Sequence, residues 1–443
     1  MHLFCLNMGD LLIPLWRGDP KMCVAPDNVA SWDWACLKGE NWEEFGQRVA
    51  ESTKYFPSSF HQPPRNPVEK ISSGYKATEF YLLLFGLGPA FLRPILPEKY
   101  WKNFCKLVRG VRTVMQRRIT LAQVKDARVF LSQFVEEFEN LYYQRRMDRL
   151  QFTRPVLHST LHVAPEISRV GNGSNISQYT MERMIGNLGQ GIRQPSNPFA
   201  NLCHLALRKS QLNALKVIYP ELDHHSQDSL PRYSVNVGGG YIFLRPRDRR
   251  ARGWDLNDPQ LLAIQNSDFC NSARYQRWGR LRLPNFQVAR SLFSESQRPS
   301  KRQQNARVTR NLIIDGTVEY GEIQFYFLDD GRPSSTSGSS SSGQSVKSKD
   351  PNEDSTPLAL VLLYKRPDAE ILRESLETLW ACKRGSNEDY CIVSITSIIS
   401  VVSIQPLPSA EERESREMWF VVEKSGLEDL ECLSGQSIDD IFE

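Results

Sequence analysis

Apolar residues recur every three to four positions through most of the first half of the chain, which is the period of amphipathic helices. The clearest helix is expected from Pro97 to Arg118, where a proline and an early glutamate open the pattern. Its expected inward face carries Tyr100, Phe104, Leu107, Val108, Val111 and Met115. Thr120 then has the side chain of a helix N-cap, and the next helix is expected to run to about Met147. Its predicted inward residues are Leu121, Val124, Phe130, Leu131, Phe134, Phe138, Leu141 and Tyr142.

Other parts of the first half follow the same period less clearly. Residues 1–18 are expected to form a buried helix, or a strand and a helix, that ends at Arg17 and Gly18. An apolar helix is expected over 76–92, broken by Gly86, Gly88 and Pro89. Further helices are expected over 156–169 and 180–218. The first half therefore predicts a mainly helical region over residues 1–228.

The pattern changes after about residue 228, where short runs of β-branched and aromatic residues alternate with turns. Strands are expected over 233–237, 241–244, 311–314, 317–327, 357–364, 390–404 and 418–422. The predicted fold class is α+β, with a small β-rich, barrel-like domain after the helices. We divide this half into a basic region over 229–330, a disordered Gly/Ser-rich insert over 331–357, the remainder of the β domain over 358–424, and an acidic tail over 425–443.

Composition narrows the class of protein. The chain is 40% hydrophobic and 24% charged, which is enough for a sizeable core. No run of 18 apolar residues occurs, so we expect no transmembrane helix. The nine cysteines include no CxxC pair, which argues against a zinc ribbon and a disulfide framework and favours a reducing compartment. The sequence has no P-loop and no GxGxxG motif.

Charge is distributed unevenly along the second half. Residues 232–310 hold sixteen Lys and Arg against five Asp and Glu, whereas residues 427–443 have acidic charges only. Basic residues interleaved with aromatic ones favour nucleic-acid contact through charge and stacking. The expected DNA-binding residues here are Arg245, Arg247, Arg249, Arg250, Arg252, Arg277, Arg280 and Arg282. The alternatives are a nuclear-localisation patch and a solvated loop.

A polar stretch from His158 to Lys216 carries the other candidate chemistry. Glu182 enters a helix directly after a Gly/Asn/Ser loop, which can place a carboxylate in a cleft as metal ligand or acid/base group. The alternative is a first-turn carboxylate favoured by the helix dipole. His158 and His162 share a helix face but lack further zinc ligands, and His162 is expected in the core or supporting the acidic site. Arg193, Arg208 and Lys209 are candidate phosphate contacts, or else a solvated face.

Several long blocks carry a resemblance to a known family. They are MHLFCLNMGDLLIPLWRG, PPRNPVEKISSGYKATEFYLLLFGLGPA, LPEKYWKNFCKLVRGVR, EFENLYYQRRMDRL, HSTLHVAPEISRVG and QYTMERMIGNLGQGIRQPSNPFANL. In this order they resemble the C-terminal part of CACTA-type (En/Spm-like) DNA transposases of the fungal type. The later LALVLLYKRPD, SIISVVSIQP and WFVVEKSGLE resemble the accessory β domain of the same proteins.

The resemblance implies the terminal part of an RNase H-like transposase core, in which three acids hold two Mg²⁺ ions that activate water and a DNA 3′-hydroxyl. Glu182 matches the third acid, and His2 matches the histidine that follows the second acid. The first two acids would lie before Met1. One carboxylate cannot hold two Mg²⁺ ions, so we expect none bound here and no strand transfer.

The expected function is therefore that of a truncated or domesticated CACTA-type transposase that binds DNA in the nucleus. DNA and a second copy of the chain are its expected partners, with neither a membrane nor a small-molecule substrate. The alternative is a domesticated chromatin- or DNA-associated interaction module without a catalytic role.

Overall fold

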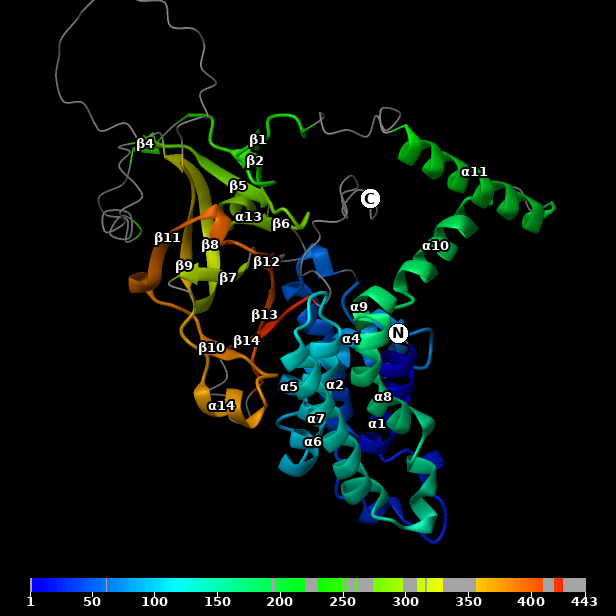
Figure 1. Ribbon diagram of the computed structural model, residues 1–443. Coiled ribbons are helices and arrows are strands. Elements are labelled where there is room, and N and C mark those ends of the chain that lie inside the picture. The colour runs from blue at the N-terminus through cyan, green and yellow to red at the C-terminus, as the bar shows by residue number, and fades with distance from the viewer. Residues whose placement is uncertain are drawn as a thin grey trace, which may run out of the picture.

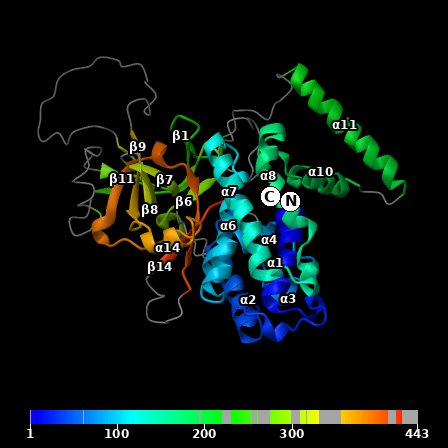
Figure 2. The ribbon, with the colours of Figure 1, turned by 60° about the horizontal axis from the view of Figure 1, so that its bottom comes forward.

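A computed structural model describes residues 2–60, 62–192, 196–219, 230–250, 252–253, 260, 274–297, 309–314, 317–329, 356–408 and 418–424. The fold is α+β, as expected: helices fill the first half and antiparallel strands the second. Figures 1 and 2 show the β half beside the helical half. No described helix has both the length and the apolar composition needed to cross a membrane.

The helical half is built from long helices joined by short 3-10 and π-helical turns. The principal elements are η1 (His2–Asn7), α1 (Met8–Arg17), α2 (Glu40–Ser52), α3 (Pro67–Lys70), α4 (Ala77–Tyr81), η6 (Leu82–Leu87), α5 (Gly88–Phe91), α6 (Glu98–Val114), α7 (Leu121–Phe138), η7 (Glu139–Tyr143), η8 (Met147–Phe152), α8 (Pro155–Val170), α9 (Gly173–Ile176), α10 (Tyr179–Gln190) and α11 (Pro198–Ile218).

The prediction for α6 and α7 is confirmed for most of their inward faces, but both helices end earlier than expected, α6 at Val114 rather than Arg118 and α7 at Phe138 rather than about Met147. Every predicted inward residue of α6 is buried except Met115, which is partly buried. Thr120 caps α7 by accepting from the backbone N–H of Gln123, whose side chain returns the bond. The prediction that Leu121 faces inward is wrong, because its side chain is 77% exposed. The first turn of α7 lies beyond the edge of the helical core.

The helix expected over 76–92 is not broken. Elements α4, η6 and α5 follow one another without a gap, and residues 82–91 are all buried. Glycine is used here for close packing: a Cβ on Gly88 would lie 2.9 Å from the ring of Phe104 on α6. Pro89 occupies the start of α5, where no intrahelical N–H is required.

The β half consists of one large and two small antiparallel sheets. The large sheet contains β1 (Val235–Asn236), β2 (Ile242–Arg247), β5 (Arg277–Arg282), β6 (Val288–Arg290), β7 (Thr309–Ile314), β8 (Thr317–Asp329), β9 (Thr356–Leu363), β11 (Tyr390–Ser394) and β12 (Ser400–Val401). The second contains β10 (Ala381–Lys383), β14 (Met418–Val422) and β13 (Ser403–Pro406), and the third β3 (Arg252–Gly253) and β4 (Arg274–Tyr275). Among the described strands the pairing does not close, so the expected barrel is absent from this part of the chain.

Two strand predictions need correction. The single strand expected over 390–404 is three strands in two sheets, interrupted by a 3-10 turn at Ile395–Ser397 that the side chain of Ser394 caps. Strands β5, β6 and β10 were not expected at all. The insert over 331–357 lies outside the described residues, apart from its last two, which begin β9.

The centre of the large sheet is buried on both faces. One face packs Trp278, Tyr326 and Val361 in a core with Phe243 and Ile398. The opposite face packs Phe325, Phe327 and Leu360 against Phe293 of α13 (Leu292–Gln297). The alternation of side chains along β8 therefore serves two separate cores.

One face of the small β10–β14–β13 sheet belongs to the helical core. Its residues and their neighbours on this face, Leu379, Ala381, Leu407, Phe420 and Val422, are buried with the helices. The other face packs Cys382, Ile404 and Val421 in a separate cluster with Tyr320 and Tyr364. Arg112 of α6 reinforces the junction by donating to the carbonyls of Phe85, Gly86 and Thr378 at 2.6, 3.2 and 2.6 Å. The two halves are thus joined by a shared apolar core and by a cation that contacts both.

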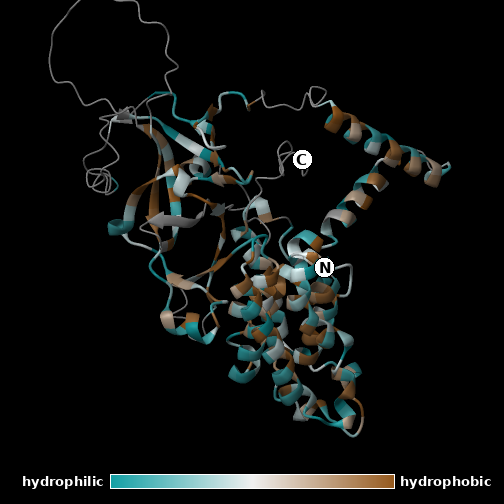
Figure 3. Cartoon of the chain, viewed as in Figure 1, coloured by the Kyte–Doolittle hydropathy of each residue, from teal (hydrophilic) through white to brown (hydrophobic). Residues whose placement is uncertain are grey.

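Helices α10 and α11 extend away from the rest of the molecule, as Figure 1 shows. Neither has a buried residue among those whose burial is described. Both carry apolar side chains (Figure 3), and Met181, Met184 and Ile185 lie exposed on one side of α10. Tyr179 ties the start of α10 to η1 through a 3.2 Å contact between its hydroxyl and the sulfur of Cys5.

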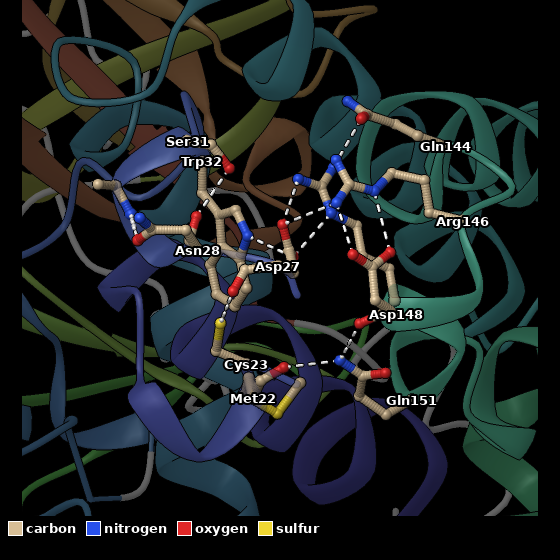
Figure 4. A network of polar contacts seen from close by, with 12 residues as sticks. Met22, Cys23, Asp27, Asn28, Ser31, Trp32, Gln144, Arg146, Asp148 and Gln151 are labelled. Carbon is tan, nitrogen blue, oxygen red and sulfur yellow. Dashed lines mark hydrogen bonds and ion pairs between the residues drawn. The ribbon is translucent and has the colours of Figure 1, made fainter. Parts of the chain in front are cut away.

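A buried ion-pair network fixes the loop after α1 against the segment after α7 (Figure 4). The carboxylate of Asp27 accepts from Arg149 Nε at 2.8 Å, from a second Arg149 nitrogen at 2.9 Å, and from the indole of Trp32 at 2.7 Å. Arg149 also donates to Gln144 at 2.6 Å, and the side chains of Asp27 and Arg149 are 1% and 2% exposed. All the charges at the centre of this network are therefore paired.

The network predicts acid sensitivity. Burial alone would raise the pKa of Asp27, but the bonds from Arg149 and Trp32 outweigh it, so the pKa lies below its ordinary value. The Asp27 carboxylate therefore stabilises the fold fully at pH values above its pKa in the unfolded chain, near 3.9. This stabilisation is lost as the pH falls through the lower pKa of the folded chain. Asp27→Asn should thus destabilise more at about pH 6 than at about pH 3, as measured by urea unfolding. Asp126→Asn, at an exposed position of α7, is the control, and an equal loss at both pH values would contradict the prediction.

Candidate nucleic-acid interface

Arginines of the predicted basic cluster lie on two paired strands, β2 and β5. The register places Leu244 opposite Arg280 and Arg247 opposite Trp278. Two residues of β2, Arg245 and Pro246, therefore face one residue of β5, Gly279, in a β-bulge. A Cβ on Gly279 would lie 2.7 Å from the ring of Pro246 and 3.0 Å from Ser294, so this contact requires glycine. The solvated-loop interpretation is wrong for residues 242–247 and 277–282.

The bulge and the turn after it present arginines to solvent. Arg245, Arg247, Arg249 and Arg250 are all exposed. Arg247 lies over the ring of Trp278, 5.2 Å from its centroid, and Arg245 lies 3.7 Å from the ring centroid of Tyr233. Stacking holds these planar groups in place while their N–H groups remain available to phosphate oxygens.

Three more arginines lie on one face of β5 and β6. The register places Arg280 directly opposite Arg290, and Arg282 follows two residues later on the same face of β5. Like charges directly opposite one another in an antiparallel pair are unfavourable. Arg280 donates to Ser294 at 3.2 Å, and all three are partly exposed. Arg290 was missed in the sequence because only strand pairing brings it next to Arg280.

Arg277 has a different role. Its guanidinium donates to Asp248 at 2.9 Å and lies 4.3 Å from the ring centroid of Phe293. The carboxylate of Asp248 is 8% exposed. The side chain therefore connects β5 to the end of β2 and to α13, with its charge balanced inside the fold. The side chain of Arg252 lies outside the described set, although its backbone forms β3.

We call Arg245, Arg247, Arg249, Arg250, Arg280, Arg282 and Arg290 together the arginine surface. Six of these seven residues come from the sequence prediction. The surface combines exposed arginines on and just after β2 with a partly exposed row on β5 and β6.

The candidates on the later helices lie elsewhere. Glu182 is exposed in the first turn of α10, which fits the helix-dipole alternative. Arg208 and Lys209 are exposed on α11, and Arg193 lies outside the described residues. Their roles in DNA contact or metal binding remain predictions.

His162 is not a core residue. Both His162 and His158 are exposed on α8, and their Nε2 atoms lie 3.0 Å apart. The buried face of α8 is made by Val156, Leu157, Thr160, Ala164 and Ile167 instead. The one-turn spacing of the two histidines was predicted correctly, but both side chains lie on the solvent side of the helix.

A two-metal site at Glu182 would need further oxygen ligands beside this carboxylate. Mg²⁺ in such sites requires several oxygen ligands in near-octahedral positions. Among the described residues no group of three or more His, Cys, Asp or Glu side chains is arranged to hold a metal ion. The described residues thus do not fit the Mg²⁺ pair that the transposase resemblance implies.

The buried polar networks of Asp27 with Arg149 and of Arg112 were not found in the sequence. Each joins segments far apart in the chain, 122 residues for Asp27 and Arg149 and 266 for Arg112 and Thr378. Both networks are structural, since their donors and acceptors satisfy one another inside the fold.

Comparison with known proteins found no relative of this chain. No protein-family model, curated protein or solved structure matches the chain. The resemblance to CACTA-type transposases therefore stays a prediction drawn from the sequence blocks themselves.

Proposed function

We propose that this protein binds DNA through the arginine surface, as a protein derived from a CACTA-type transposase and acting in the nucleus. The observation that carries the proposal is the direct opposition of Arg280 and Arg290, with Arg282 beside them on the same face. Guanidinium groups arranged in such a row can donate to the phosphate oxygens of a nucleic-acid backbone. Exposed Arg245 and Arg247 on β2, with Arg249 and Arg250 after it, add further positive charge at the end of this strand pair.

The proposal does not include strand transfer. Glu182 is exposed, and the described part of the chain offers no three-ligand metal group beside it. Binding to the sugar–phosphate backbone requires only the arginines and no metal. We therefore expect binding with little sequence preference and without cleavage.

The test is a DNA-binding titration with a labelled duplex between about 50 and 200 mM salt. The variant replaces Arg245, Arg247, Arg249 and Arg250 with glutamine. Each lost phosphate contact should lower the slope of log affinity against log salt by about 0.9, so the slope should fall by about 3–4. Affinity at the lower salt should fall roughly tenfold or more.

The matched control removes four positive charges from exposed positions of the helical half. These are Lys70, Lys125, Arg128 and Arg169, each changed to glutamine. Both variants have the same net charge, so a fall in slope confined to the β2 variant assigns binding to the arginine surface. Equal slopes in the two variants would contradict that assignment. Nicking in the presence of Mg²⁺ that Glu182→Ala abolishes would contradict the exclusion of catalysis.

A second candidate function is a protein-interaction module without DNA contact. The exposed apolar side of α10, with Met181, Met184 and Ile185, favours it. It is distinguished by the same titration, because an interaction module would show no DNA binding at any salt concentration.

A further inference from the structure

Two histidines of α8 lie side by side on the solvent face of the helix, within hydrogen-bond distance of each other. His158 and His162 lie one turn apart, both exposed, with ring centroids 4.6 Å apart and ring planes at 75°. Their two Nε2 atoms point at each other across 3.0 Å. With neutral rings, one of these nitrogens donates its proton to the lone pair of the other.

The spacing of the histidines lets one ion reach both rings. Metal–imidazole bonds of about 2.0–2.1 Å place two nitrogens about 2.9–3.4 Å apart for angles between a right angle and the tetrahedral angle. The 3.0 Å separation is that of the hydrogen bond, and rotation of the two exposed rings turns both lone pairs toward one ion. Among divalent first-row ions nitrogen ligands favour Cu²⁺ most, with Ni²⁺ just before it in the series, and both ions accept neighbouring nitrogens in tetragonal geometry.

The helix holds the pair in this geometry. Leu157, Thr160 and Ala164 lie on the opposite side of α8 and are buried in the helical half. The backbone between the histidines is therefore fixed, and only the outward side chains adjust. Since both rings are exposed, water can fill the remaining coordination positions. A prearranged pair of ligands loses little conformational entropy on binding.

We propose that His158 and His162 form a bidentate site for a divalent transition-metal ion of tetragonal geometry, Cu²⁺ or Ni²⁺. The ion takes the lone pair of each Nε2, and the shared proton moves to the other ring nitrogen, Nδ1. The described residues add no third side chain in position to ligate, so water completes the coordination. This site is separate from the arginine surface and does not rest on DNA binding.

The experiment uses the full chain with Ni²⁺ or Cu²⁺ alone in a buffer that does not bind metal. Every protein tested carries His2→Ala, Cys203→Ser, His224→Ala and His225→Ala, because these imidazole and thiol groups compete for the ions. Isothermal titration with Ni²⁺ should show one ion bound per chain. His158→Ala and His162→Ala should each weaken binding at least tenfold, since a single imidazole cannot chelate.

His204→Ala on α11 is the matched control, because it removes a single exposed histidine and should leave binding unchanged. Electron paramagnetic resonance of the Cu²⁺ complex should show two nitrogen ligands in the parent protein and fewer in either single variant. Binding that survives in His158→Ala, or that is lost in His204→Ala, would overturn the proposal. Zn²⁺ binding tighter than Cu²⁺ would overturn the choice of a tetragonal ion.

Discussion

Arg149→Met should lower the free energy of unfolding by about 3–5 kcal/mol. The substitution leaves the carboxylate of Asp27 buried, with the indole of Trp32 at 2.7 Å and the more exposed guanidinium of Arg146 at 3.4 Å as its remaining side-chain partners. Breaking a buried pair by removing one partner is costly because the other charge stays out of water. Methionine fills much of the arginine volume, so the loss reports the charge rather than a cavity.

Urea unfolding followed by circular dichroism measures this effect. Arg169→Met is the control because it makes the same change in an exposed pair with Glu166, whose side chain is 43% exposed. Exposed pairs contribute at most about 1 kcal/mol, so the control should stay near the parent protein. A loss below about 1 kcal/mol for Arg149→Met would mean that water enters the network and screens it.

The second large effect is expected at Arg112. Arg112→Met removes charged donors from the carbonyls of Phe85, Gly86 and Thr378. Bonds from a charged donor contribute about 1.5–3 kcal/mol each, so a loss of about 3–5 kcal/mol is expected. Because Thr378 lies beside the small sheet, the change should also loosen the junction of the two halves.

Two measurements separate these consequences. Urea unfolding gives the total loss, and limited proteolysis shows whether the segment around Thr378 becomes accessible. Arg109→Met is the matched control: it lies one turn earlier on α6 and reaches the same segment through Glu377, but both side chains of that pair are partly exposed. We expect a loss below about 1 kcal/mol there. Equal losses for the two variants would show that the hydrogen bonds of Arg112 to the three carbonyls contribute no more stability than the partly exposed Arg109–Glu377 pair.

The sequence predicted elements whose signals are local. The helix α6 and the cap at Thr120 depend on side chains within a few residues, and both are confirmed. Strand β5 was missed because its apolar residues, Trp278 and Leu281, are three apart and separated by arginines and a glycine. Its strand identity comes from pairing with β2, β6 and β8, which no local pattern contains.

The candidate site was predicted only in part for the same reason. Charge clustering identified most of the arginine surface, but not which members face solvent. Arg277 and Arg247 are both arginines among aromatics, yet Asp248 neutralises one and the other is exposed. The histidine spacing on α8 was evident, whereas the side of the helix depended on its packing. The pairing of Asp27 with Arg149 had no local signal.

The shared core has a consequence during synthesis of the chain. Leu379, Ala381, Leu407, Phe420 and Val422 complete the apolar interior of helices whose last buried member, Ile167, is made far earlier. Ribosomes add roughly 5–20 residues per second, so the helical half waits roughly 10–50 s for its final packing residues. During that interval the nascent helices expose the apolar surface that the small sheet later covers. A chaperone that binds exposed apolar surfaces would therefore bind the helical half before Val422 is synthesised.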